Sequence, residues 1–267
     1  MKPPPPLSQQ ETIELLLERS GRPGHFPIRN SFLEIRRGKE RRPGPFAALI
    51  ARRDERALQL FLLVHAVTSS DKQSGAFDVT EWATTWARTL GLFAEASGAT
   101  AVSRVWKRLA ADVLITRRRG SLRRTNITVL SEDGSGDPYT APSGAKSDPY
   151  FKVPFAYWTD EKAWYRTLSL PARAVLLIAL SREPRFYLPH NQAATWYGVS
   201  EDTIRQGLHE LQDHKLLSAD EVLYIPSLTS PTGWTPRTFY RLQGAFEKAT
   251  RGPDELSAEP PATEASA

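Results

Sequence analysis

Apolar residues recur at helical spacing in three stretches of the first half of the chain. In the second stretch Asp78 precedes Glu81 by three positions, which is the capping-box pattern that starts a helix. In the third stretch the apolar positions are three or four apart and form a single face. The predicted helices cover residues 46–68 (as one helix or two), 78–90 and 99–111.

After residue 111 the apolar period changes from 3.6 towards two. Residues 113–119 and 122–130 alternate as strands do, and Gly120 with Ser121 supplies a turn between them. Three helices followed by a hairpin is the element order of a winged helix. We therefore expect a first winged-helix domain over residues 46–130.

Residues 131–149 are rich in Ser, Gly, Asp and Pro and predict a linker before a second domain at 150–247. In that domain Ser169 is placed to cap a helix that has Pro171 in its first turn. A short helix then ends at Gly198, and Ser200 caps the next one. Strand-like residues 222–225 and 237–242 flank a loop with turn composition, which predicts a second wing.

Both ends of the chain are poor in apolar residues. Residues 1–45 predict a proline-rich leader and a basic arm, with a short helix at 11–19 and a partly ordered strand near 31–36. Residues 248–267 have the composition of a disordered acidic tail. The expected fold class is mostly α with small β-hairpins (α+β), as two winged helix-turn-helix domains in tandem with flexible termini.

The turn and core positions of the second domain resemble those of winged helix-turn-helix DNA-binding proteins. The matching residues are Gly198, Val199, Ser200, Thr203, Ile204, Leu208, Leu211, Leu216 and Leu217. In that family the second helix of the motif enters the major groove and the hairpin touches the backbone or the minor groove. The resemblance therefore implies base-facing candidates on the second helix and a wing contact, namely Glu201, Thr203, Arg205, Gln206, His209 and Arg237.

The first domain resembles the same family less closely, because its segment 91–98 is longer than the usual tight turn. Two such domains joined by a linker are similar to plasmid replication initiators. The same arrangement occurs in transcriptional regulators and in accessory subunits of chromosome condensation. The resemblance covers about residues 168–242 and matches no single protein.

The net charge of +5 and the sequence pI near 9.5 favour a polyanionic partner. The charge is uneven along the chain, because basic residues exceed acidic ones by seven over residues 19–56 and by one over residues 150–250. The second domain is therefore a weak attractor of phosphate. Two interpretations of its motif stay open, base reading or use as a dimerisation or protein-contact surface.

The strongest cationic signal lies in the first domain, on its third helix and its hairpin. One helix face is apolar while the opposite face is polar and basic, and no acidic residue lies between 113 and 130. Charges on an edge strand often serve only solubility. Repulsion among five arginines on one hairpin instead favours a polyanion. The candidate DNA contacts here are Ser103, Arg104, Lys107, Arg108, Arg117, Arg118, Arg119, Arg123 and Arg124.

Several other kinds of chemistry are not indicated. The chain has no cysteine, and its five histidines include no metal-binding pair. It also lacks a nucleotide-binding loop and a nucleophile elbow. Most tryptophans lie at core spacings, whereas Trp234 lies in the predicted second wing and is a candidate for base stacking. We expect no enzyme, no metal, no cofactor, no small-molecule substrate and no membrane span.

The function expected from these patterns is double-stranded DNA binding in the cytoplasm. A replication initiator or a transcriptional regulator of a plasmid or mobile element fits best, and a homodimer is compatible with it. The alternative is an architectural or protein-interaction protein of the chromosome-condensation accessory type.

Overall fold

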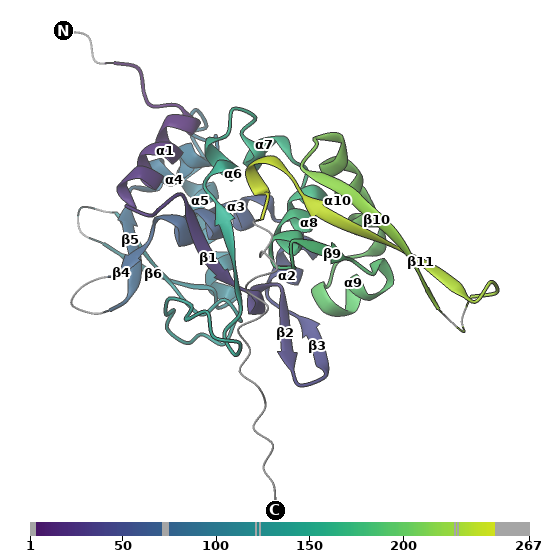
Figure 1. Ribbon diagram of the computed structural model, residues 1–267. Coiled ribbons are helices and arrows are strands. Elements are labelled where there is room, and N and C mark those ends of the chain that lie inside the picture. Colours follow the sequence, from purple (N-terminus) through teal and green to yellow (C-terminus); the bar gives the residue numbers. More distant parts are fainter. Residues whose placement is uncertain are drawn as a thin grey trace, which may run out of the picture.

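The computed structural model describes residues 4–70, 75–120, 122, 124–226, 228 and 230–248. The fold is α+β, with 42% helix, 24% strand and four small antiparallel sheets in the described part of the chain (Figure 1). The expectation of a mostly α chain built as two winged helix-turn-helix domains in tandem was therefore wrong. Strands β1 (His25–Arg29), β2 (Glu34–Arg37) and β3 (Glu40–Pro43) form in the predicted arm, and the segment predicted as a helix from residue 78 begins as strand β5 (Phe77–Glu81).

The first half of the chain builds a four-stranded sheet in the order β4-β5-β7-β6, with helices packed against it. In chain order the elements are α1 (Gln9–Arg19), β1 (His25–Arg29), the 3-10 helix η1 (Asn30–Phe32), β2 (Glu34–Arg37), β3 (Glu40–Pro43), α2 (Phe46–Ala51), α3 (Glu55–Val67), β4 (Ser69–Ser70), β5 (Phe77–Glu81), α4 (Ala83–Thr89), α5 (Gly98–Ala111), β6 (Ile115–Arg119) and β7 (Thr125–Val129). The predicted capping box was wrong, because Asp78 and Glu81 pair with Thr128 and Thr125 in a sheet.

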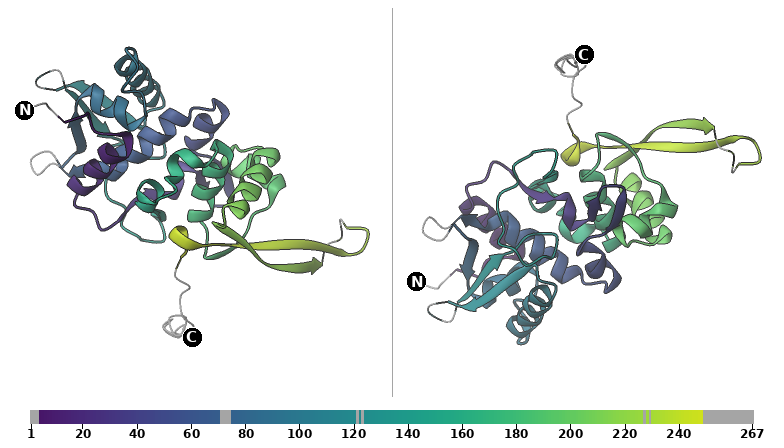
Figure 2. Two further views of the ribbon diagram at one scale, coloured as in Figure 1. Left: turned by 90° about the horizontal axis from the view of Figure 1, so that it is seen from above. Right: turned by 90° about the horizontal axis from the view of Figure 1, so that it is seen from below.

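The second half is organised around one buried helix and a three-stranded sheet in the order β10-β11-β9. Its elements are β8 (Tyr150–Pro154), α6 (Ala156–Thr159), α7 (Trp164–Thr167), α8 (Leu170–Leu180), β9 (Arg185–Tyr187), α9 (His190–Tyr197), α10 (Glu201–Asp213), β10 (Leu217–Pro226), β11 (Trp234–Leu242) and the 3-10 helix η3 (Gly244–Phe246). The β10–β11 hairpin projects far beyond the body of the molecule (Figure 2). No helix in the described ranges combines the length and the apolar character that crossing a membrane requires.

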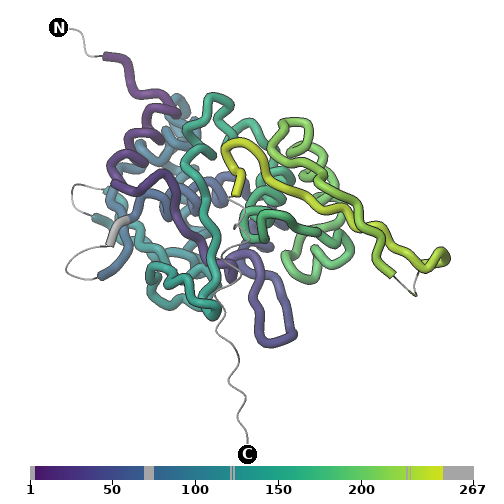
Figure 3. Tube along the Cα trace, in the orientation of Figure 1, coloured from purple at the N-terminus to yellow at the C-terminus, as the bar shows by residue number. Residues whose placement is uncertain are grey.

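A two-stranded sheet joins the predicted arm to the start of the predicted second domain. Strand β1 pairs antiparallel with β8, and Phe26 lies opposite Val153. Figure 3 shows the purple tube of β1 beside the teal tube of β8. Beside this sheet the Arg29 guanidinium donates to the buried Glu132 carboxylate at 3.0 Å and to Asp148 at 2.6 Å. These bonds fasten the segment between β7 and β8 to the body of the protein.

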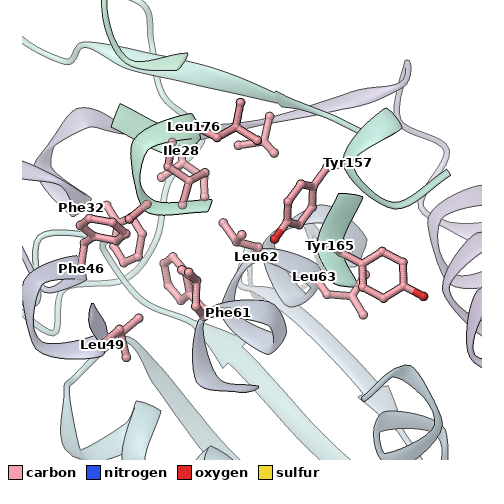
Figure 4. Close-up of a cluster of buried hydrophobic side chains, with 14 of the residues drawn as sticks. Ile28, Phe32, Phe46, Leu49, Phe61, Leu62, Leu63, Tyr157, Tyr165 and Leu176 are labelled. Carbon is pink, nitrogen blue, oxygen red and sulfur yellow. The ribbon is translucent and has the colours of Figure 1, made fainter. Parts of the chain in front are cut away.

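The two halves share a continuous hydrophobic core. Phe32 stacks on Phe61 of α3 with ring centroids 4.4 Å apart, and Ile28, Leu62 and Leu176 complete the same cluster (Figure 4). Leu176 belongs to α8, in which nearly every residue is buried. Helix α8 is therefore a central element between the two halves rather than a surface helix of the second.

Two glycines have structural roles here. Gly198 ends α9, and Gly207 lets α10 pack closely on α8. Gly198 ends α9 with φ of 65°, and Ser200 caps α10 by accepting a hydrogen bond from the Thr203 amide, so both local predictions were confirmed. A Cβ at Gly207 would lie 2.4 Å from the Pro171 carbonyl oxygen. Helix α10 therefore rests directly on the backbone of α8.

Candidate nucleic-acid interface

Helix α5 presents a cationic face because its apolar side chains turn inward. Its buried apolar residues are Val102, Val105, Trp106 and Leu109. The Trp106 ring packs edge to face with Trp86 of α4, with centroids 5.3 Å apart, which fixes the rotation of the helix. Arg104 and Lys107 are therefore exposed, and neither has an ion-pair partner among the residues that the structure describes.

Strand β6 lies at the edge of the four-stranded sheet and carries three consecutive exposed arginines. Arg117 and Arg119 lie opposite the buried residues Ile127 and Thr125, whereas Arg118 points to the other face of the sheet. Neither Arg118 nor Arg119 has a hydrogen-bond or ion-pair partner within the described ranges. Strand alternation thus spreads cationic groups over both faces of the edge.

Arg117 connects the hairpin to the helix. Its Nη1 donates to the Ser103 hydroxyl oxygen at 2.8 Å. A shallow groove of about 330 Å3 lies at this junction, and its polar lining is made by Thr100, Ser103, Arg104, Lys107 and Arg117. The groove is therefore rimmed by three cations and two hydroxyls, which are groups that bind phosphate oxygens.

Arg108 has a structural partner, unlike its neighbours on α5. Its Nε donates to Asp54 Oδ2 at 2.5 Å and its Nη2 to Oδ1 at 2.9 Å. Asp54 also caps α3 through the Ala57 amide. Burial alone would raise the pKa of Asp54, but the hydrogen bonds from Arg108 and the amide hold that pKa below its usual value. Arg108 therefore joins α5 to α3 and is not one of the unpaired cations of the α5 face.

The other end of the hairpin pairs an arginine with a tryptophan. The Arg124 guanidinium lies over the Trp82 ring, 5.3 Å from its centroid, and Trp82 is 41% exposed. The prediction that most tryptophans pack in the core gave no sign of this contact, because the preceding segment was predicted as helix rather than strand. The candidate Arg123 lies outside the described residues.

Helix α10 carries the second group of candidates, and most of them are bonded within the helix. Asp202 accepts hydrogen bonds from Arg205 at 3.5 Å and from Gln206 at 2.6 Å. The imidazole of His209 lies 3.0 Å from the Asp213 carboxylate. The Thr203 hydroxyl is 2.8 Å from the hydroxyl of the capping residue Ser200. The polar face of α10 is thus largely satisfied before any partner arrives.

The three remaining candidates lie on the β10–β11 hairpin and at the start of α10. Arg237 is exposed on β11, and its guanidinium lies 5.1 Å from the centroid of the Tyr187 ring. Glu201 opens α10 and is exposed beside the helix N-terminus. Trp234 is 51% exposed near the end of the hairpin. These side chains are accessible, but they are not part of the groove between α5 and β6.

The structure brings most of the predicted candidates on α5 and β6 together at one groove. Sequence reasoning missed the contact between Arg124 and Trp82 and did not foresee that Arg108 is paired. Within the described ranges no cluster of three His, Asp or Glu side chains is arranged to hold a metal ion. Comparisons with models of known protein families, with curated proteins and with solved structures found no match.

Proposed function

We propose that this protein binds double-stranded DNA, with α5 and the β6–β7 hairpin as its main contact surface. One observation carries the proposal: exposed cations surround a single groove and its edge without ion-pair partners among the described residues. These cations are Arg104, Lys107, Arg118 and Arg119, together with Arg117, which bonds only to Ser103 in the described part.

The electrostatic repulsion among these cations is better explained by binding of a polyanion than by a role in keeping the edge strand soluble. Like charges close together repel one another, and a phosphate backbone relieves that repulsion while releasing its own counterions. Guanidinium groups also match phosphate oxygens through paired hydrogen bonds. An edge strand can be protected by one lysine or one bulge, so a row of three arginines exceeds that need.

The finer proposal is control of replication or transcription of a plasmid or mobile element, in the cytoplasm where such DNA lies. Its support is the resemblance of the α9–Gly198–α10 segment to helix-turn-helix DNA-binding proteins. Selection of bound duplexes from a random pool would test it, followed by sequencing. A palindromic site would support a homodimeric regulator and direct repeats an initiator, whereas the absence of any enriched sequence would contradict both.

A second candidate is an architectural or protein-interaction role, which one observation favours. The register of the β10–β11 hairpin places Val222, Tyr224 and Trp234 on one face, and Tyr224 is 66% exposed. Exposed apolar faces often bind proteins. Size-exclusion chromatography with and without DNA discriminates the two roles, since this role predicts a complex with a protein and only weak, salt-labile DNA binding.

The main test is an anisotropy titration of DNA binding at several salt concentrations. We expect R117A/R118A/R119A to reduce the slope of log K against log salt by up to about 2.7, since each neutralised phosphate contributes about 0.9 to that slope. The matched control is R56A/K152A/K162A, which removes the same charge from exposed residues on other parts of the surface. An unchanged slope in the first variant would overturn the proposal.

A further inference from the structure

The basic arm of the sequence folds into a hairpin that lies against the second half of the chain. Strands β2 and β3 form this hairpin, and β3 packs on α9 (Figure 1). Its ten residues, Glu34–Pro43, include five basic and two acidic side chains. The second half, which is nearly neutral in sequence, thus gains cations from a segment more than a hundred residues away.

Stacking, hydrogen bonding and close backbone packing fix the hairpin in this position. The Arg41 guanidinium stacks on the Trp196 ring of α9 at 3.5 Å from its centroid. The same guanidinium donates to the buried Glu34 carboxylate, from Nε at 3.0 Å. At Gly198 a Cβ would lie 2.5 Å from the Cβ of Ala47 and 3.3 Å from that of Pro43, so the turn after α9 sits directly on the end of β3.

The remaining cations of the hairpin have no structural task in the described part of the chain. Arg36 shares Glu34 with Arg41. Arg37, Lys39 and Arg42 are exposed, and the described residues supply none of them with a hydrogen-bond or ion-pair partner. The hairpin therefore uses two basic residues to hold its position and leaves three at its tip and outer face.

A groove of about 420 Å3 lies on the other side of Trp196, between α9 and the β10–β11 hairpin. The Arg182 guanidinium lies 5.6 Å from the centroid of the Trp196 ring, and Arg237 lines the opposite wall. Asn191 and Gln192 add exposed amides at the start of α9. The described lining residues include no carboxylate, so this groove and the basic hairpin flank one tryptophan with hydrogen-bond donors on both sides.

We propose that the β2–β3 hairpin and the α9 groove together form a second phosphate-binding surface, which holds a second stretch of the DNA duplex bound by α5 and β6. The inference rests on the proposed function. The second half of the chain then contacts the DNA phosphate backbone. The residues that make this contact are Arg37, Lys39, Arg42, Arg182 and Arg237. Helix α10 needs no free cations of its own under this arrangement, because phosphate contacts set position and base contacts set sequence preference.

The test compares two triple variants in the same salt titration with the full-length chain. R37A/K39A/R42A is expected to reduce the salt slope by up to about 2.7 and to weaken binding to random and selected duplexes by the same factor. R56A/K152A/K162A again serves as the charge-matched control. Circular dichroism melting curves should be unchanged, because the three hairpin side chains form no hydrogen bond or ion pair with the described residues.

R117A/R118A/R119A separates failure of this inference from failure of the proposed function. If that variant loses slope while the hairpin variant keeps it, the second surface is overturned and the α5 surface stands. If only the hairpin variant loses slope, the α5 surface is overturned, and with it the arrangement in which the hairpin holds a second stretch of the same duplex. If the wild-type chain shows no salt-dependent DNA binding, or if both variants match it, both proposals fall.

Discussion

Helices α5 and α10 are alike in length, with 14 and 13 residues, and both bury one apolar face. They differ in where the acidic residues lie. On α10 Asp202 and Asp213 stand three or four residues from Arg205, Gln206 and His209 and bond to them. On α5 there is no acidic residue within the helix, and among the described residues only Arg108 has an acidic partner elsewhere. Polar side chains on a helix are thus available for a partner only when the same helix does not satisfy them.

The strength of the ion pairs within α10 determines how much α10 and α5 differ in their expected affinity for DNA. Exposed ion pairs contribute about 0–1 kcal/mol, so a DNA phosphate or base can displace Asp202 from Arg205. The displaced aspartate then remains beside the phosphate and repels it. We therefore expect contacts from α10 to add specificity at a low net affinity, whereas contacts from α5 contribute affinity directly.

The largest expected effect comes from removing two exposed cations from α5. R104A/K107A should weaken DNA binding about sixty-fold at 0.1 M salt, since each phosphate that is no longer neutralised removes about 0.9 log unit relative to 1 M salt. R205A/Q206A on α10 should weaken binding to random duplexes by less than about three-fold. Anisotropy titrations at 0.1 M salt measure both. Equal reductions in affinity in the two variants would remove the distinction between the helices.

The two halves of the chain differ in how a histidine of each makes the folding stability depend on pH. Burial, with Arg22 and Arg29 nearby, lowers the pKa of His65 on α3 to about 3, while burial lowers the pKa of the half-buried His190 on α9. The unfolded chain binds a proton at His65 near pH 6.5 and the folded chain does not. Folding stability should therefore fall by up to about 1.4 kcal/mol per pH unit as the pH drops from about 6.5 towards 3.

The measurement is urea unfolding of wild type, H65F and H190F between pH 7 and pH 4.5. Phenylalanine keeps a ring beside Phe61 and Tyr139 but binds no proton. The stability of H65F should depend less on pH than that of wild type, and H190F should differ from wild type less than H65F does. A pH dependence in H65F as steep as in wild type would contradict the assignment.

The smallest expected effect is an increase in DNA affinity. D202N weakens the acceptor of Arg205 and Gln206 and removes a negative charge from α10. If Arg205 then reaches a phosphate, the salt slope should rise by about 0.9 and the affinity at 0.1 M salt by up to about eight-fold. E161Q makes the same charge change at an exposed residue outside the helix and serves as the control. A gain of equal size in E161Q would attribute the effect to net charge alone.

Short sequence patterns correctly predicted a helix and two caps that depend on neighbouring residues. The helix expected over 99–111 is α5 at Gly98–Ala111, and the Gly198 and Ser200 caps lie where the sequence places them. Propensity and capping act over a few residues, so a short window contains their signal. The strand expected over 113–119 was found for the same reason, as β6 at Ile115–Arg119, and its three arginines are consecutive in the sequence.

Long-range pairing was not predictable in this way. Strand β1 lies in the predicted arm and β8 at the start of the predicted second domain, and no short window of sequence indicates that the two pair. Arg108 looked free because its partner Asp54 is 54 positions away. The basic arm was expected outside both domains, but Trp196 and Gly198 hold its hairpin against the second half.

The pairing of β1 with β8 also bears on how the chain is made. A ribosome releases Phe26 and Ile28 early, whereas the strand that covers them, Tyr150–Pro154, emerges only after the whole of the first half has been synthesised. Contacts so distant in sequence form slowly and late in folding. The N-terminal half must therefore wait in an incomplete state during translation. A fragment that ends at residue 130 lacks the partner strand and the Glu132 anchor of Arg29, and it should expose apolar surface.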